Sequence, residues 1–206
     1  NLAGEPLKPE LVDELYESSA ANCVYDLYGP SESTTYSTYA LRSANGRETI
    51  GCPVANTQAY VVDSEGQLLP TGVVGELHLG GVGLARGYLH RPASTAEKFI
   101  PNRFSEVPGE RLYRTGDLAR WLPDGTLEYL GRVDHQVKVR GYRIELGEVQ
   151  SVLLAHDGVR DAVVIARDDA SGNKRLVGYI VGETDVDTES LVSALRSRLQ
   201  EQLPSY

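Results

Sequence analysis

Cysteine is scarce in this sequence of 206 residues, in which Cys23 and Cys52 are the only two. Two thiols without a C-x-x-C spacing support neither a structural zinc site nor the disulfide framework of a small secreted domain. We therefore expect both to be buried, apolar thiols in a reducing compartment, and we expect the protein to be cytoplasmic.

Positive charge is also scarce: the sequence has 20 Lys and Arg residues but 29 Asp and Glu residues, which gives a net charge of -9. Nucleic-acid binding depends on clustered Lys and Arg at the phosphates, so this balance argues against DNA or RNA as a partner. No apolar run approaches the roughly twenty residues that span a membrane. The length allows one medium and one small domain, each with a core of its own.

The first part of the chain predicts a helix followed by two strands. Pro9 suits a first helical turn, and apolar residues recur at helical spacing over residues 9–20. Strands are predicted at 22–26 and 35–41, joined by a polar, exposed loop over Tyr28–Ser33.

A β-rich region follows, with turn residues between its strands, which predicts a sheet or small barrel. The predicted strands are residues 59–62, 75–79, 118–122 and 127–130. The glycine-rich run Gly80–Gly87 lacks the Lys-Ser or Lys-Thr that closes a phosphate-binding loop, so we interpret it as tight structural turns.

The pattern changes after Asp134. A hairpin over residues 136–144 is followed by a helix from Leu146, two strands and a final helix capped by Asp187. The predicted strands are residues 159–166 and 176–181. The expected fold class is α/β with α+β: residues 1–134 form the β-rich end of a large domain, and residues 135–206 form a small α+β domain.

Four motifs occur in a fixed order, and each by itself is most often a plain turn or strand. They are residues 27–32 (LYGPSE), 75–89 (GELHLGGVGLARGYL), 113–118 (YRTGDL) and 131–148 (GRVDHQVKVRGYRIELGE). Taken in order, they resemble the adenylate-forming superfamily and, within it, the adenylation domains of non-ribosomal peptide synthetases. The resemblance spans nearly the whole chain and implies that residues 135–206 are the lid domain of that family.

The first motif has the chemistry of a nucleotide site. Tyr28 offers a flat face to a purine, Gly29 permits close backbone approach, Ser31 can donate to a phosphate oxygen, and Glu32 can hold Mg²⁺. The resemblance assigns the same roles and makes Ser31 and Glu32 the catalytic candidates. The alternative is a loop in which Tyr28 packs and Glu32 is solvated.

Other motif residues match a ribose site. Asp117 follows a Thr-Gly turn and can accept hydrogen bonds from both ribose hydroxyls, the alternative being a turn-capping aspartate. Arg132 offers several donors to ribose and phosphate oxygens, and the resemblance places it beside the nucleotide with Tyr129. The alternative for Arg132 is a surface salt bridge.

Resemblance alone adds a further set of nucleotide residues: Gly4, Glu5 and Pro6 correspond to the stretch that lines the adenine. Asp26 stands where the family usually has Asn. A carboxylate near phosphates would repel them unless it points elsewhere or meets a donor.

The resemblance also implies a side-chain pocket, a hinge and a channel for a carrier arm. The pocket would be lined by Asn1, Ala3, Leu27, Thr35 and Tyr36, none of which carries a charge. Asp134 would be the hinge, the alternative being a polar linker residue, and Lys138 and Gly141 would line the channel. The four histidines, His78, His90, His135 and His156, lack ligand spacing and receive no role.

The function implied is activation of an amino acid by ATP and Mg²⁺, followed by transfer to the phosphopantetheine thiol of a peptidyl carrier domain. Neighbouring synthetase domains are the expected partners, and an MbtH-like protein is a further candidate. The phosphate loop and the substrate aspartate would precede Asn1 and the catalytic lysine would follow Tyr206, so this stretch alone is expected to be inactive. An acyl- or aryl-CoA synthetase and an inactive nucleotide-binding fragment are the alternatives.

Overall fold

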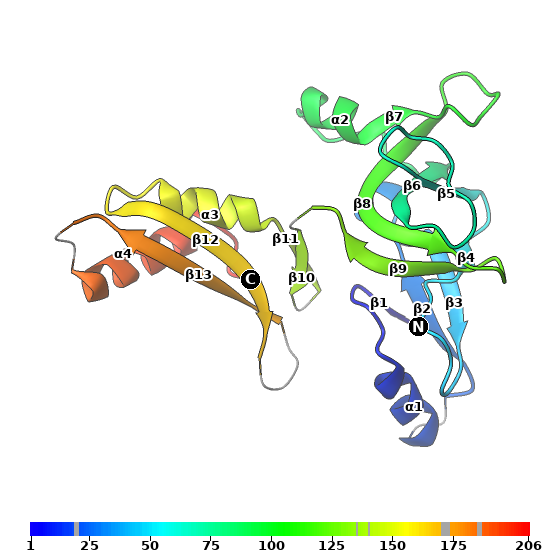
Figure 1. The fold of residues 1–206 in the computed structure, drawn as a ribbon, viewed down its shortest axis with the longest axis horizontal. Coiled ribbons are helices and arrows are strands. Elements are labelled where there is room, and N and C mark those ends of the chain that lie inside the picture. Colours follow the sequence, from blue (N-terminus) through cyan, green and yellow to red (C-terminus); the bar gives the residue numbers. More distant parts are fainter. Residues whose placement is uncertain (19–20, 135, 140, 170–173, 185–186) are drawn as a thin grey trace. The chain divides into compact units, whose positions relative to one another are not determined.

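The computed structural model describes residues 1–18, 21–134, 136–139, 141–169, 174–184 and 187–206 (Figure 1). The chain divides into two compact units, Asn1–Asp134 and His135–Tyr206, each with its own core. The division falls where the sequence pattern changes. The identification of the second unit as a lid domain stays a prediction.

The first sheet of unit 1 has four strands in the order β1-β2-β3-β4 (Figure 1). They are β1 (Leu2–Ala3), β2 (Val24–Tyr28), β3 (Thr38–Arg42) and β4 (Cys52–Pro53), and only β1 and β2 are parallel to each other. Helix α1 (Pro9–Ser18) packs on this sheet because its buried Val12 joins Leu7 and Val24 in a small apolar cluster.

The second sheet of unit 1 is antiparallel and has five strands. They are β5 (Thr57–Val62), β6 (Gly75–Gly81), β7 (Phe99–Pro101), β8 (Arg111–Trp121) and β9 (Leu127–Arg132). The long strand β8 pairs with β6, β7 and β9 along different parts of its length. Helix α2 (Pro92–Lys98) precedes β7 and was not predicted.

A shared core connects the two sheets. Leu77, Leu79, Ala119 and Leu127 of the second sheet are fully buried, and Tyr28 from the end of β2 packs against their cluster. The chain therefore holds the first motif beside the strands that carry the third and fourth motifs.

Several predicted boundaries were displaced. Strand β2 begins and ends two residues later than predicted, and residues 19 and 20 of the predicted helix lie outside the described residues. Strand β3 begins at Thr38, because Thr34 and Thr35 have φ angles of 54° and 72°, which break an extended chain. The strand predicted at 118–122 is the end of the eleven-residue β8.

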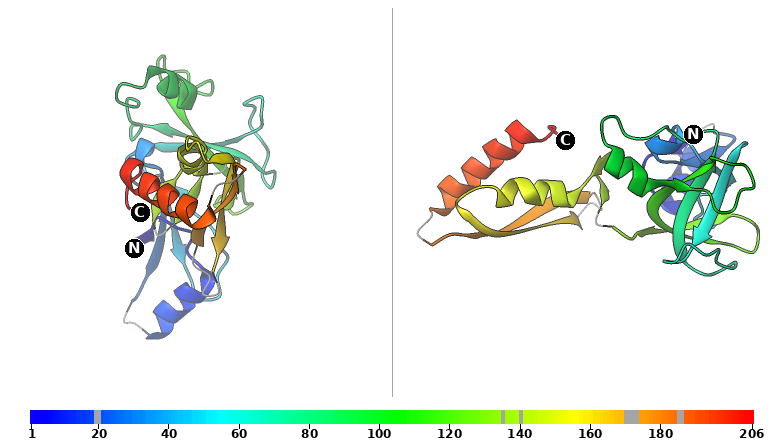
Figure 2. Two further views of the ribbon diagram at one scale, coloured as in Figure 1. Left: turned by 90° about the vertical axis from the view of Figure 1, so that its left-hand side faces the viewer. Right: turned by 90° about the horizontal axis from the view of Figure 1, so that it is seen from above.

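Unit 2 is an α+β arrangement. Strands β10 (Val137–Val139) and β11 (Tyr142–Ile144) form the predicted hairpin, and β12 (Val159–Asp168) and β13 (Lys174–Gly182) form an antiparallel ribbon. Helices α3 (Leu146–Leu154) and α4 (Thr188–Gln202) lie on one side of that ribbon (Figure 2) and bury Leu153, Leu191 and Leu195 with Ala162 and Val164. The predicted cap is confirmed, since Asp187 accepts a 2.9 Å hydrogen bond from the Ser190 amide.

The expectation of two buried thiols was wrong. Cys23 is exposed directly before β2, and Cys52 is partly buried, with its Sγ 3.3 Å from the Gly125 carbonyl oxygen. Among the helices in the described part of the chain, none is long and apolar enough to cross a membrane.

Candidate nucleotide site

Asp117 stands on a bulge in β8. The register passes from Glu76↔Leu118 to His78↔Arg114, so the three residues Thr115–Asp117 lie opposite Leu77 alone. The Thr115 hydroxyl closes the bulge by donating to the Leu77 carbonyl oxygen at 2.6 Å and accepting from the Asp117 amide at 2.9 Å. Asp117 is thereby held in a buried position, with 6% of its surface exposed.

Gly116 is required at the centre of this bulge. Its φ of 73° lies in the region that glycine alone enters without cost. A Cβ added there would lie 2.8 Å from Arg132 Nη2 and 2.9 Å from Asp134 Oδ2. Gly116 thus leaves the space that the side chains of Arg132 and Asp134 occupy.

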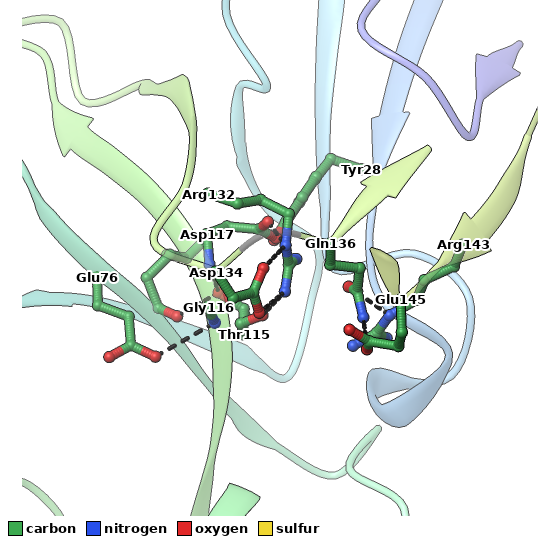
Figure 3. A network of polar contacts seen from close by, with 11 residues as sticks. Tyr28, Glu76, Thr115, Gly116, Asp117, Arg132, Asp134, Gln136, Arg143 and Glu145 are labelled. Carbon is green, nitrogen blue, oxygen red and sulfur yellow. Dashed lines mark hydrogen bonds and ion pairs between the residues drawn. The ribbon is translucent and has the colours of Figure 1, made fainter. Parts of the chain in front are cut away.

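Arg132 on β9 is the hub of the polar network in Figure 3. Its Nη1 donates to Asp117 Oδ1 at 2.6 Å, while Nε and Nη2 donate to the two oxygens of Asp134 at 2.6 and 2.7 Å. Nη2 also reaches the Thr115 carbonyl oxygen at 3.0 Å. Although burial opposes the charge, hydrogen bonding to Asp134 and the negative charge of Asp117 raise the pKa of the guanidinium. With 14% of its side chain exposed, Arg132 is more enclosed than the surface salt bridge weighed from the sequence.

Tyr28 completes the contacts around Asp117. Its hydroxyl donates to Asp117 Oδ2, and burial, followed by the negative charge of Asp117, raises the Tyr28 pKa well above its usual value. The Tyr129 ring lies 6.2 Å from the Tyr28 ring, and burial raises the pKa of Tyr129 to about 12. Both phenols therefore stay neutral, and Tyr28 acts as a hydrogen-bond donor that orients the carboxylate.

Glu32 is not the solvated loop acid of the alternative hypothesis. The segment predicted as an exposed loop contains a single 3₁₀ turn, Ser31–Ser33, in which Glu32 is 8% exposed and Ser31 is exposed. The Tyr88 hydroxyl donates to Glu32 Oε1 at 2.7 Å, and burial together with this bond raises the Tyr88 pKa. The predicted exposure failed because residues far along the chain cover the turn.

The glycine-rich run supplies part of that cover. The Ala85 amide donates to the Glu32 carbonyl oxygen at 2.8 Å, and the Thr34 hydroxyl donates to the Gly83 carbonyl oxygen at 2.6 Å. The run therefore lies against the turn that holds Glu32, in keeping with a structural role.

Asp26 meets a donor inside the protein. Its Oδ2 lies 2.8 Å from Arg42 Nη1, and both side chains are almost fully buried. Arg42 Nη1 also donates to the Leu7 carbonyl oxygen at 3.1 Å. Burial raises the Asp26 pKa even though the Arg42 guanidinium acts to lower it. The nucleotide role of Asp26 stays a prediction, and the ion pair shows how its charge is balanced.

The remaining predicted residues of unit 1 lie at the start of the chain and around the turn. Gly4, Glu5 and Pro6 are exposed between β1 and α1. Of the predicted pocket residues, Ala3 and Leu27 lie side by side in the β1–β2 register, while Asn1 and Tyr36 are exposed. A Cβ on Gly29 would come within 2.6 Å of the Thr35 carbonyl oxygen, so Gly29 has a structural reason of its own.

In unit 2, Lys138 lies on β10 opposite Arg143, and Gly141 adopts a φ of 78° in the hairpin. Gln136 braces this hairpin by donating to Glu145 and accepting from Arg143 Nε at 2.6 Å (Figure 3). His135 and Arg140 lie outside the described residues.

Three contributors to the site received no role from the sequence: Glu76, Tyr88 and Thr115. The signal for Glu76 is present in the sequence, because an acidic residue stands directly before Leu77 in a strand whose Leu77 and Leu79 are fully buried. Within the described residues, no group of three or more His, Cys, Asp or Glu side chains could hold a metal ion.

Comparisons with solved structures give the same fold. The structure of holo-PA1221, an NRPS protein containing adenylation and PCP domains, matches with a TM-score of 0.80 and 29% identity over 98% of this chain and 35% of that chain. A four-domain nonribosomal peptide synthetase, holo-AB3403 bound to AMP and glycine, matches at 41% identity with a TM-score of 0.60, over 99% of this chain and 15% of that one.

Sequence comparisons give the family. A linear gramicidin synthase and tyrocidine synthase 2, both of Brevibacillus parabrevis, are 55% and 50% identical to this chain over its full length. The chain spans only 4% and 6% of these two relatives. The sequence model described as AMP-binding enzyme matches residues 2–89, and that of the AMP-binding enzyme C-terminal domain matches residues 148–206. The chain therefore belongs to the family of AMP-binding enzymes.

Proposed function

We propose that the protein containing this chain activates an amino acid with ATP and passes it to the phosphopantetheine thiol of a peptidyl carrier domain. The observation that carries the proposal is the buried network of Tyr28, Asp117 and Arg132. It presents an oriented carboxylate and a guanidinium in a chain that is about half identical to peptide synthases. Neighbouring synthetase domains are the proposed further partners, with an MbtH-like protein as a candidate.

Asp117 is the proposed ribose acceptor. A carboxylate has about four lone-pair positions, so it can accept from ribose hydroxyls as well as from Arg132 and Tyr28. Because Tyr28 is held by packing and Arg132 by its bonds to Asp134 and Thr115, the carboxylate needs little reorganisation on binding. Gly4, Glu5 and Pro6 would line the adenine, the Tyr28 ring would face the purine and Gly29 would permit close backbone approach. Tyr129 would lie beside the nucleotide with Arg132, and Asp26 is a further proposed nucleotide residue.

Glu32 is the proposed Mg²⁺ ligand, and Ser31 the proposed phosphate donor. A single carboxylate suits Mg²⁺, which usually binds one or two protein carboxylates and completes its shell with phosphates and water. The ion, when bound with ATP, would neutralise phosphate charge. The Tyr88 hydroxyl holds Glu32 in place through one of its two carboxylate oxygens.

We expect Glu32→Gln to slow adenylation by about tenfold, because the amide keeps the shape but loses the charge that Mg²⁺ prefers. High Mg²⁺ should restore part of the rate. Pyrophosphate exchange at increasing Mg²⁺ measures this, with Tyr88→Phe as a control that removes only the supporting hydroxyl. An unaltered rate and metal dependence in Glu32→Gln would return the carboxylate to a structural role.

Asp134 is the proposed hinge, with Lys138 and Gly141 proposed to line the route of the carrier arm. Asp134→Pro fixes φ at about −65° and should affect adenylation and thioester formation to different degrees, because each step requires its own backbone geometry. Asp134→Ala is the matched control, since it removes the two bonds to Arg132 but leaves φ free. Pyrophosphate exchange and single-turnover loading of the carrier domain measure the two steps. Equal losses of Asp134→Pro in both steps, or no loss in either, would identify Asp134 as a linker residue.

The experiment that tests the function itself is pyrophosphate exchange by the complete protein with a panel of amino acids, fatty acids and aryl acids. Exchange with an amino acid supports the proposal. Exchange with acyl or aryl acids alone would make the protein a CoA-type ligase, and ATP binding without exchange would make it an inactive binder. Because the pocket residues Asn1, Ala3, Leu27, Thr35 and Tyr36 carry no charge, a neutral side chain is expected to be preferred.

A further inference from the structure

Glu76 lies directly beside the bulge that carries Asp117. Its Oε1 accepts a hydrogen bond from the Gly116 amide at 3.2 Å (Figure 3). Gly116 is the residue before Asp117, and it lies in the register shift between the pairs Glu76↔Leu118 and His78↔Arg114. The Glu76 carboxylate thus accepts from the Gly116 amide of the bulge. The Thr115 hydroxyl donates to the Leu77 carbonyl oxygen and accepts from the Asp117 amide.

Two basic side chains lie beside Glu76. Arg114 Nη2 and His78 Nε2 lie 3.3 and 3.5 Å from Glu76 Oε2, so one carboxylate oxygen faces these side chains and the other faces the bulge. His78 is buried and Arg114 is partly exposed. Burial acts to raise the Glu76 pKa, but the neighbouring His78 and Arg114 lower it to about 2, so the carboxylate is ionised under all ordinary conditions.

We propose that Glu76 is a positioning residue for the nucleotide site: by holding the Gly116 amide it fixes the backbone from which the Asp117 carboxylate, oriented by Tyr28 and Arg132, is presented to the ribose hydroxyls. The proposal rests on the ribose role of Asp117 given above. It gives a function to the acidic residue of the second motif. It also gives a reason for a carboxylate, 16% exposed, next to the fully buried Leu77.

The geometry separates this role from a plain ion pair. A structural pair would need only Arg114 and Glu76, and such exposed pairs contribute little. Here the oxygen that does not face Arg114 and His78 is directed at the backbone of the bulge. Without it, the Gly116 amide would lose this acceptor, and the backbone would be held by the Thr115 hydroxyl and by the bonds from Arg132 and the Val133 amide. A shift of about 1 Å in a positioning group is enough to cost up to ~100-fold in a reaction that depends on alignment.

The test measures binding of ATP and of dideoxy-ATP, which lacks both ribose hydroxyls, to the complete protein by calorimetry. Wild-type protein should prefer ATP. In Glu76→Ala, ATP binding should weaken about tenfold while dideoxy-ATP binding stays unchanged, so that the preference is lost. Glu128→Ala is the matched control, because Glu128 pairs with Arg120 between β8 and β9 but does not contact the bulge. It should keep the wild-type preference.

A double variant tests whether Glu76 acts through Asp117. Adding Glu76→Ala to Asp117→Ala should cause no further loss of ATP binding, because the group being positioned is already gone. A further tenfold loss, or a Glu76→Ala protein that keeps the preference for ATP, overturns the proposal while leaving the ribose role of Asp117 intact. Equal binding of both nucleotides by the wild type overturns that ribose role, and this proposal with it.

Should Glu76→Ala fail to fold, Glu76→Asp tests the same positioning role. It keeps the charge beside His78 and Arg114 but draws the carboxylate back from the Gly116 amide by one methylene. Loss of the preference for ATP in this variant supports the positioning role, and a preserved preference overturns it.

Discussion

Asp117→Ala is expected to raise the apparent KM for ATP by about 10- to 100-fold and to lower adenylation. The ribose hydroxyls lose a charged acceptor, and such hydrogen bonds contribute about 1.5–3 kcal/mol. The variant also leaves the Tyr28 hydroxyl and one arm of Arg132 without their acceptor, which adds to the loss. Pyrophosphate exchange measured against ATP concentration reports the change.

The matched control is Asp117→Asn, which keeps one carbonyl oxygen as an acceptor. It should lie between the wild type and Asp117→Ala in apparent KM, with melting temperatures of all three compared to exclude misfolding. An ATP curve for Asp117→Ala that superimposes on that of the wild type would remove Asp117 from the ribose site.

Arg42→Met is expected to be the most destabilising of the substitutions considered, at about 3–5 kcal/mol. The arginine is 1% exposed and its removal leaves the buried carboxylate of Asp26 without a counter-charge. It also removes the donor that holds the Leu7 carbonyl oxygen. Urea unfolding followed by circular dichroism measures the loss. Asp26→Leu/Arg42→Met should recover most of it, because removing both charges leaves no uncompensated ion.

The loss in Arg42→Met should depend on pH in a direction that follows from Asp26. Burial already raises the Asp26 pKa above that of the unfolded chain, and loss of Arg42 raises it further. A raised carboxylate pKa destabilises the folded state at pH values above it. This penalty shrinks as the pH falls through the folded pKa and vanishes below the unfolded value near 3.8. Destabilisation that is equally large at pH 7 and pH 4 would assign the loss to packing rather than to the unpaired charge.

Elements with a strong local pattern could be predicted from the sequence. Helix α4 has its leucines on one side and its cap at Asp187, and both were found where the pattern placed them. Helix α2 could not be predicted, because it buries no residue and therefore has no apolar stripe. Strand β8 was shortened in the prediction because Thr115 and Gly116 indicate a turn, whereas in the structure they form a bulge inside a continuous strand.

The site residues themselves could be predicted from the sequence, whereas the residues that contact them could not. Motif order singled out Tyr28, Asp117 and Arg132, and the structure brings these three together. The partners that fix a group come from distant parts of the chain. Glu32 is covered by Tyr88, 56 residues away, and the Gly116 amide is held by Glu76, 40 residues away. No local pattern encodes such pairs, because they depend on how strands are ordered in the sheet.

The shared guanidinium of Arg132 has a consequence for the interpretation of mutational scans and of natural variation. One side chain serves the carboxylates of both Asp117 and Asp134, and Gly116 provides the space in which they meet. Effects of single substitutions at these positions will not sum, since each change alters what the others contact. Whether a substitution is tolerated at one of these positions will depend on the residues at the other positions. Among relatives, these positions are therefore expected to vary together or not at all.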